Sequence, residues 1–187
     1  MKKFIAILLL IIIAGAAYLY INFGDLSKNA VEKIATEALG VSVKISSLDL
    51  SLSDKKVTVS NIRIANPSGY KKSTAVSVGS VSIALAEVPK NFDLIKFKLV
   101  EVKDVNVNLE VSQKSTNLTD LKNGMPSSPS SGSSQSKVSL EKFYINSSTL
   151  NPSVTLIDTN LTSVTVPSVT LYGIGTKGNG VLAKDAI

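Results

Sequence analysis

Apolar and polar residues alternate along most of this chain. Residues 42–67 read SVKISSLDLSLSDKKVTVSNIRIANP, in which nearly every second side chain is apolar. A period of two puts successive side chains on opposite faces of a β-strand, so the pattern predicts strands with one apolar and one polar face. The phase slips at Ser46-Ser47 and again at Ser60-Asn61. A slip by one residue would turn the apolar set outward, so each slip indicates a β-bulge or a bend.

The alternation continues almost to the end of the sequence. A turn is predicted at residues 66–69, and a hairpin near Lys103-Asp104 is expected to join two of the later strands. About ten short strands are predicted in all. Those after residue 70 are expected near 81–85, 97–99, 105–111, 138–140, 143–145, 154–156, 161, 164–166 and 169–171.

An amphipathic helix is predicted before the strands. Residues 25–39 read DLSKNAVEKIATEAL, in which apolar side chains recur every three to four positions. Asp25 or Ser27 is a suitable N-cap, and Gly40 stands where a glycine ends many helices. Acidic residues accompany the lysines of this segment, so we expect it to pack on the sheet rather than lie in a membrane interface.

The chain begins with a hydrophobic segment. Residues 4–21 form one uncharged apolar run, long enough to cross roughly 30 Å of hydrocarbon as a helix. Lys2 and Lys3 before it predict a cytoplasmic N-terminus. A cleaved signal peptide is the alternative, with Ala14-Gly15-Ala16 as its cleavage site. The run continues past this site, which favours an uncleaved anchor, and either interpretation places the body outside the cytoplasm.

These segments predict a four-part organisation. A transmembrane anchor at 1–23 precedes a helix-plus-sheet domain at 24–125. Residues 126–136, PSSPSSGSSQS, contain too few apolar side chains to order and are expected to form a flexible loop. Residues 137–187 continue the β-sheet, and Val181–Ala186 resembles the first turns of a C-terminal helix.

Composition excludes much common enzyme chemistry. The sequence has no Cys and no His, which rules out disulfides, thiolate or imidazole zinc sites, and Ser-His-Asp or Cys-His catalysis. The carboxylates are spread over predicted polar strand faces and turns, and no pair stands out as a glycosidase-like acid and base. We therefore expect a protein that is not an enzyme and that uses no cofactor or metal.

Two short motifs have simple structural explanations. Residues 173–178 match G-x-G-x-x-G, but phosphate binding would also need a parallel βαβ unit and an acidic residue about 20 positions on. We expect a glycine-rich connection from a strand to a helix instead. Asn117, Asn146 and Asn160 match the glycosylation pattern, which arises easily by chance in a Ser/Thr/Asn-rich chain.

The positive charge does not favour a nucleic-acid partner. The formal net charge is +6, of which Lys2 and Lys3 supply two. The lysine pairs at 55–56 and 71–72 are separated by strand-like sequence, and no aromatic series accompanies them as a base-stacking platform would require. Solvated surface charge is the favoured interpretation, and contact with anionic lipid headgroups is the next.

The order of these segments resembles the N-terminal region of AsmA-like proteins. In that family a membrane segment and a short helix lead into a G-x-x-V-x-I-x-x-L-x-L strand, then a V-x-N-I-x-I-x-N-P strand and turn, then further strands. The matching stretches are EALGVSVKISSLDLSL (37–52), KVTVSNIRIANPSGY (56–70), VSVGSVSIAL (76–85) and LVEVKDVNVNLEV (99–111). The resemblance covers roughly residues 1–111.

The resemblance implies a single-pass inner-membrane protein of Gram-negative bacteria with a periplasmic body. Its relatives are thought to form a long U-shaped β-sheet with an apolar groove, related to bridge-like lipid-transfer proteins. This chain is much shorter than the large members. Ten to twelve strands side by side would span only about 50 Å, and the serine-rich loop has no counterpart in the family pattern.

The fold class expected from all of this is mainly β. An N-terminal transmembrane helix and a short amphipathic helix accompany a curved, mostly antiparallel sheet that forms a U-shaped groove or half-barrel. A helix over 25–39 would be about 22 Å long and would cover only part of a 50 Å trough. Apolar surface left uncovered usually marks a binding groove or an interface.

Two functions could use such a surface. The first is binding of membrane-lipid acyl chains in phospholipid transport or envelope maintenance; the second is a structural or assembly role, in which the sheet face or edge docks on an envelope protein or a second copy. The predicted groove residues are Val43, Ile45, Leu48, Leu50, Val57, Val59, Ile62, Ile64, Val81, Ile83, Val105 and Val107.

Overall fold

The computed structural model describes residues 27–87, 93–126, 137–155, 157 and 159–182. The predicted membrane anchor at 1–23, nearly all of the serine-rich loop, and residues 183–187 lie outside the described residues. Among the helices that are described, none has the length and apolar character needed to span a bilayer.

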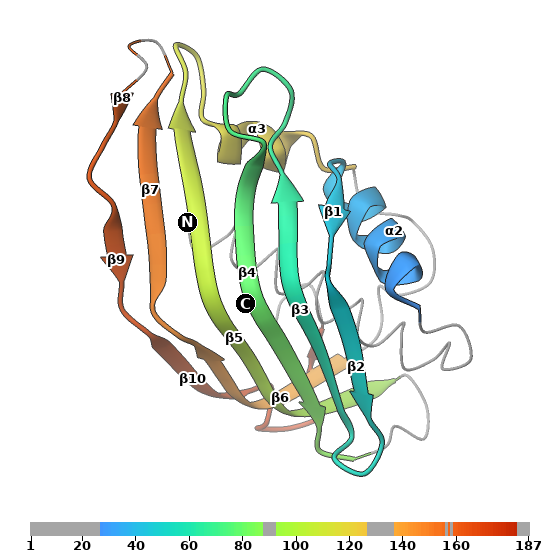
Figure 1. The fold of residues 1–187 in the computed structure, drawn as a ribbon. Helices are drawn as coiled ribbons and strands as arrows, with labels where there is room; N and C mark the ends of the chain where they lie inside the picture. Colours follow the sequence, from blue (N-terminus) through green and yellow to red (C-terminus); the bar gives the residue numbers. More distant parts are fainter. Residues whose placement is uncertain (1–26, 88–92, 127–136, 156, 158, 183–187) are drawn as a thin grey trace.

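The described part of the chain is mainly β, as the alternation predicts. It contains two helices and an 11-stranded sheet (Figure 1). The elements are α2 (Lys28–Leu39), β1 (Val43–Lys44), β2 (Ser47–Ser51), β3 (Lys56–Ala65), β4 (Thr74–Leu85), β5 (Leu94–Val111), α3 (Asn117–Asn123), β6 (Lys137–Ile145), β7 (Ser148–Val154), β8 (Thr159–Asn160), β9 (Val164–Val166), β10 (Val169–Ile174) and β11 (Val181–Leu182).

Many of these strands lie end to end rather than side by side. β1 and β2 follow one another along β3, and β6 and β7 follow one another along β5. β8 and β9 pair with β7, and β10 pairs with β6. The sheet across its width therefore has the order β1-β3-β4-β5-β6-β10, about 25–30 Å at roughly 4.8 Å per strand. The expected width of 50 Å is wrong because it counted collinear segments as neighbours.

The sheet is mostly antiparallel, with one parallel junction. β5 runs parallel to both β6 and β7, whereas the other strand pairs described are antiparallel. A parallel neighbour requires a long connection rather than a tight turn. The chain supplies it between Val111 and Lys137, where α3 lies at one end of the sheet (Figure 1).

The predicted amphipathic helix is α2, and its caps are those expected. The Ser27 Oγ accepts a hydrogen bond from the Ala30 N–H at 3.2 Å, which identifies Ser27 rather than Asp25 as the N-cap. Gly40 has φ +69° and its N–H donates to the Thr36 carbonyl. The turn leads directly into β1, so α2 lies beside that edge of the sheet (Figure 1).

The phase slips line up in a transverse bend across the sheet. Asn61 in β3 and Asp104 in β5 both have positive φ, at +50° and +55°. Gly79 lies between them in β4, where a Cβ atom would sit 2.7 Å from the Asp104 Cβ. Gly79 has no regular partner in either neighbouring strand. The pairing with β3 skips from Ser60↔Ser80 to Ile62↔Val78. The pairing with β5 skips from Lys103↔Ser80 to Val105↔Val78. The predicted irregularity at Ser60-Asn61 is confirmed.

The same line continues to both edges of the sheet. Ile45 and Ser46 separate β1 from β2, which confirms the slip predicted at Ser46-Ser47. Asn146 and Ser147 separate β6 from β7, and Pro167 and Ser168 separate β9 from β10. Because an extra residue is inserted in each strand, the apolar side chains stay on one face on both sides of the bend.

Three local predictions are wrong. Lys103-Asp104 is not a hairpin, because β5 continues through it as one 18-residue strand with a positive φ at Asp104. Val181 and Leu182 form β11, paired with β6, rather than the start of a helix. The glycine-rich segment at 173–178 accordingly joins two strands, β10 and β11.

The sheet is also open and uncurled, with β1–β2 at one edge and β8–β10 at the other (Figure 1). The long strands β3, β4 and β5 bend along their length, but the two edges do not pair. The described residues therefore do not by themselves form the expected U-shaped groove or half-barrel.

Candidate functional site

The strand register collects the apolar side chains into four transverse rows, which we call the apolar face. Residues paired across neighbouring strands point to the same side of a sheet, so each row lies on one face. The rows are Val43-Ile64-Val76-Val107-Leu150-Val164, Ile62-Val78-Val105-Ser148-Val166, Leu48-Val59-Val81-Val102-Ile145-Val169 and Leu50-Val57-Ile83-Val100-Phe143-Leu171.

All twelve predicted groove residues lie on the apolar face. Eleven belong to the rows, and Ile45, directly after β1, lies on the same side as Val43. They differ in burial, however. Val43, Ile45, Ile64, Val81 and Ile83 are buried; Leu48, Val57, Val59, Ile62, Val105 and Val107 are half-buried; Leu50 is exposed.

The middle of the apolar face is a packed core, and most of its exposed side chains lie at the β9–β10 end. Val100 and Phe143 are 0% and 2% exposed, whereas Leu171 in the same row is 45% exposed. The other three rows also end in exposed side chains, Val164, Val166 and Val169. Sequence reasoning left these four out of the groove. Their alternation and the slip at Pro167-Ser168 were the signals that could have included them.

At the opposite edge, α2 covers β1. The Ile45 N–H donates to the Glu32 carboxylate at 2.8 Å, and the Val43 N–H donates to the Thr36 Oγ1 at 3.0 Å. The Lys44 ammonium lies 3.2 Å from the same carboxylate. The Ile45 N–H lowers the pKa of Glu32, burial opposes this shift, and Lys44 adds to it. Two side chains of α2 thus satisfy donors that β1 would otherwise present to another strand.

A second buried carboxylate holds the polar end of β5. Glu110 is 2% exposed and accepts hydrogen bonds from the N–H groups of Lys71 and Lys72 and from the Asn66 amide, at 2.7–3.0 Å. The Glu110 N–H donates to Asn117, which is fully buried at the start of α3. This network fixes the β3–β4 loop and α3 against β5. Burial of Asn117 is also inconsistent with its use as a glycosylation site.

A neighbouring contact fastens the same loop to α3. The Tyr70 hydroxyl donates to Asp120 at 2.5 Å, and the Ser115 hydroxyl donates to Asp120 at 2.6 Å. Ser115 first and Tyr70 second lower the pKa of Asp120, whereas burial and then Asp120 raise the pKa of Tyr70.

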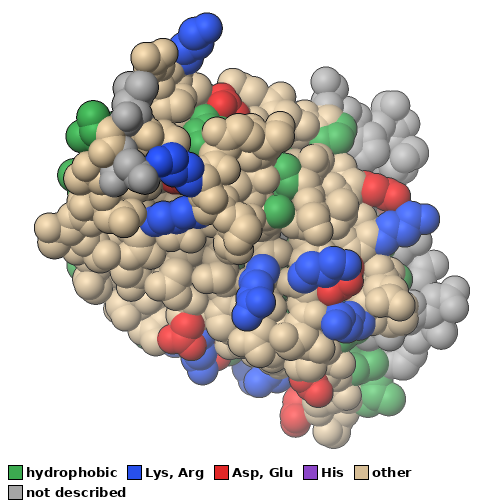
Figure 2. Space-filling model, turned by 45° about the horizontal axis from the view of Figure 1, so that its top comes forward, with side chains coloured by type: hydrophobic (Ala, Val, Ile, Leu, Met, Phe, Trp, Pro, Cys, Tyr) green, Lys and Arg blue, Asp and Glu red, His purple; other side chains and the backbone are tan. Residues whose placement is uncertain are grey.

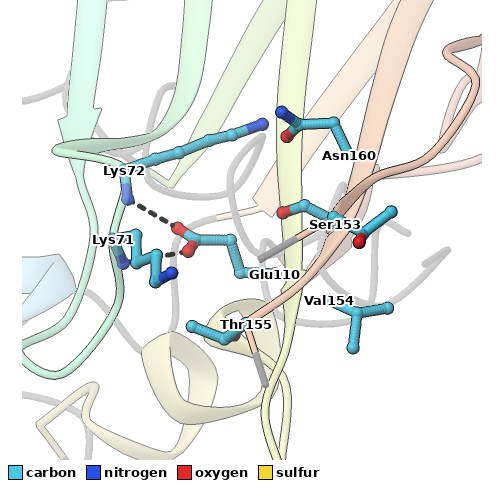
Figure 3. Close-up of a pocket in the computed structure, with 8 residues that line it drawn as sticks. Lys71, Lys72, Glu110, Ser153, Val154, Thr155 and Asn160 are labelled. Carbon is cyan, nitrogen blue, oxygen red and sulfur yellow. Dashed lines mark hydrogen bonds between the residues drawn. The ribbon is translucent and has the colours of Figure 1, made fainter. Parts of the chain in front are cut away.

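Glu110 also lines a cavity of about 220 Å³ (Figure 3). The lining is polar, with Lys71 and Lys72 from the loop and Ser153, Thr155 and Asn160 from or beside β7 and β8. Glu110 and its register partner Ser153 alternate with the row residues, so the cavity lies on the polar face of the sheet. Its polarity does not suit an acyl chain. The Glu110 carboxylate is already bonded to the three donors, which indicates a structural role.

Polar side chains dominate the side of the molecule seen in Figure 2, where lysine and acidic residues intermingle and hydrophobic side chains are scattered. Among the described residues, no group of three or more acidic side chains could hold a metal ion. The apolar face is therefore the best candidate for a functional surface. Comparisons with protein-family models, curated proteins and solved structures find no match.

Proposed function

We propose that this chain is a membrane-anchored periplasmic protein of the AsmA-like type. It binds lipid acyl chains on the apolar face and contributes to phospholipid transport or envelope maintenance, without covalent chemistry. The anchor is the apolar run at 4–21, with the N-terminus in the cytoplasm.

The observation that carries the proposal is the continuity of the apolar face up to an exposed end. The four rows cross the sheet from β1–β2 to β9–β10. At the β9–β10 end Val164, Val166, Val169 and Leu171 are 39–51% exposed. A hydrocarbon chain laid on this end would leave water at about 0.8 kcal/mol per buried methylene. The surface offers it no charged group, since residues 159–176 contain none.

Photolabelling in a bilayer tests the proposal. The full chain is reconstituted in nanodiscs that contain a phospholipid with a diazirine in its acyl chain, and labelled residues are mapped by mass spectrometry. Labels are expected on Val164, Val169 and Leu50. Labels confined to residues 4–21, or as frequent on Ser80 and Ser82 of β4 as on the apolar face, would count against lipid binding.

A matched pair of variants sharpens this test. Leu50 and Asp49 are neighbouring exposed residues of β2 on opposite faces of the sheet. Leu50→Asn should reduce labelling at the β2 end of the apolar face several-fold. Asp49→Asn introduces the same residue on the polar face and should leave labelling unchanged. Equal effects of the two substitutions would contradict a role for the apolar face.

The open edge favours a second candidate, an assembly module. Within the described part of the chain, no strand pairs with the outer side of β8, β9 or β10. Such an edge can accept a strand from another chain. This function requires a stable protein complex rather than bound lipid, and crosslinking in cells distinguishes the two.

A further inference from the structure

The β9–β10 edge has features that suit pairing with an identical edge. It is exposed, apolar on one face and free of charge from residue 159 to residue 176. Natural edge strands usually carry charged residues or a cover that prevents such pairing. β1 has a cover in α2, and β2 is flanked by Asp54, Lys55 and Lys56. Pairing of β9–β10 with a copy of itself would bring no like charges together.

The alternation of side chains along β9–β10 permits this edge to pair with the same edge of a second copy. A two-fold axis perpendicular to the sheet, passing between Pro167 and Ser168, places Val166 opposite Val169 of the second copy. It also places Val164 opposite Leu171. All four side chains lie on the apolar face in each copy, and this axis keeps both apolar faces on the same side. The rows of one copy would therefore continue into those of the other.

The bend agrees with the same register. Within one chain, the pairs Ile145↔Val169 and Ser148↔Val166 leave Asn146-Ser147 and Pro167-Ser168 without regular partners. Pairing across the two-fold axis would place Pro167-Ser168 of one copy opposite Pro167-Ser168 of the other, so the bend would continue across the interface. Pro167 has no N–H to donate and is tolerated where ladder hydrogen bonds are already interrupted.

We propose that a second copy of this chain adds to the β9–β10 edge in antiparallel orientation, centred on Pro167-Ser168. The interface is isologous, as in most homodimers. It joins two sheets into one, with a continuous apolar face and one α2-covered edge at each end. The proposal goes beyond lipid binding and does not depend on it.

The mass of the full chain tests the dimer. Native mass spectrometry from detergent should report a dimer for the unmodified protein. Val169→Lys places a charge in the centre of the interface and should reduce the association constant by about tenfold or more. Leu52→Lys adds the same charge to an apolar side chain that is 65% exposed beyond the end of β2, and should leave the dimer intact. A monomeric unmodified protein, or equal behaviour of the two variants, would overturn the proposal.

Disulfide crosslinking tests the register with smaller substitutions. The chain has no natural cysteine, so introduced thiols report without background. In the proposed register a Val166→Cys chain mixed with a Val169→Cys chain should form a disulfide between copies, because directly opposite Cα atoms lie about 4.5–5.5 Å apart, a separation that a disulfide spans. Each variant alone should crosslink poorly. Efficient crosslinking of either variant alone, or none in the mixture, would overturn this register. Photolabelling by lipid reports a different quantity, so either proposal can fail while the other stands.

Discussion

The two edges of the sheet carry the same kind of apolar side chains, but only one of them, at β1, is covered by a described helix. At β1, α2 lies alongside and its Glu32 and Thr36 accept the N–H groups of Ile45 and Val43. Val43 there is 3% exposed, whereas Val164 at the other end of the same row is 51% exposed. No described helix or strand covers β9–β10 in this way.

The difference between the two edges depends on the element that precedes each edge strand in the chain. α2 ends at the left-handed Gly40, which turns the chain directly into β1 and keeps the helix beside that strand. β9 and β10 instead follow short strands of the same sheet. The β1 part of one edge is therefore covered within the chain, whereas β9–β10 remains available to lipid or to a second copy.

The largest expected effect comes from comparing the two positions of one row. Phe143 and Leu171 are cross-strand partners, 2% and 45% exposed. Phe143→Ala should lower the free energy of unfolding by about 3–5 kcal/mol, because it opens a cavity in the core. Leu171→Ala should cost about 1 kcal/mol in a monomer. Urea unfolding of the full chain checks both, and similar losses would mean that the β9–β10 end is covered in solution.

The next effect concerns the network that holds α3 and the β3–β4 loop. Glu110→Ala removes the acceptor of three hydrogen bonds and should cost about 3 kcal/mol. Glu101→Ala, on the same strand, removes a pair with the half-exposed Lys103 and should cost less than about 1 kcal/mol. The comparison is made by thermal unfolding. Equal losses would contradict the structural role of Glu110.

A smaller loss is expected when α2 no longer covers β1. Glu32→Ala leaves the buried Ile45 N–H without its acceptor and should cost about 2 kcal/mol. Glu37→Ala, on the exposed side of α2, should stay within about 0.5 kcal/mol. Hydrogen exchange of the Ile45 amide gives a direct measure of the cover. Unchanged protection in Glu32→Ala would show that the helix closes the edge without this carboxylate.

The smallest effect is on the pH dependence of stability. The folded protein lowers the pKa of Glu32 below its ordinary value of 4.5, so ionised Glu32 stabilises the fold above that pH. This contribution should be lost as the pH falls through the lower folded pKa. Glu32→Gln lacks this contribution at every pH. The free energies of unfolding of the variant and the unmodified protein should therefore differ less below pH 4.5 than above it. Asp120 also has a lowered pKa, but it is present in both proteins. Parallel curves of unfolding free energy against pH for the two proteins would contradict a stabilising role of ionised Glu32.

Local features of the fold were predictable because a few neighbouring residues specify them. Ser27 and Gly40 cap α2 through contacts within one turn of the helix. Asn61 has a positive φ where the alternation slips. The prediction of a hairpin at Lys103-Asp104 failed for a related reason. A polar pair that breaks the alternation fits a turn and a bend within one strand equally well, and pairing with β4 decides between them.

The sequence alone determined that this protein is built from strands with one apolar face, because a period of two has one structural solution. It also placed all twelve predicted groove residues on that face. The tertiary structure decided that strands lie end to end along β3 and β5, that β5 and β6 are parallel, and that Phe143 is buried while Leu171 is exposed. These outcomes depend on hydrogen bonds between residues far apart in the chain, which no local pattern specifies.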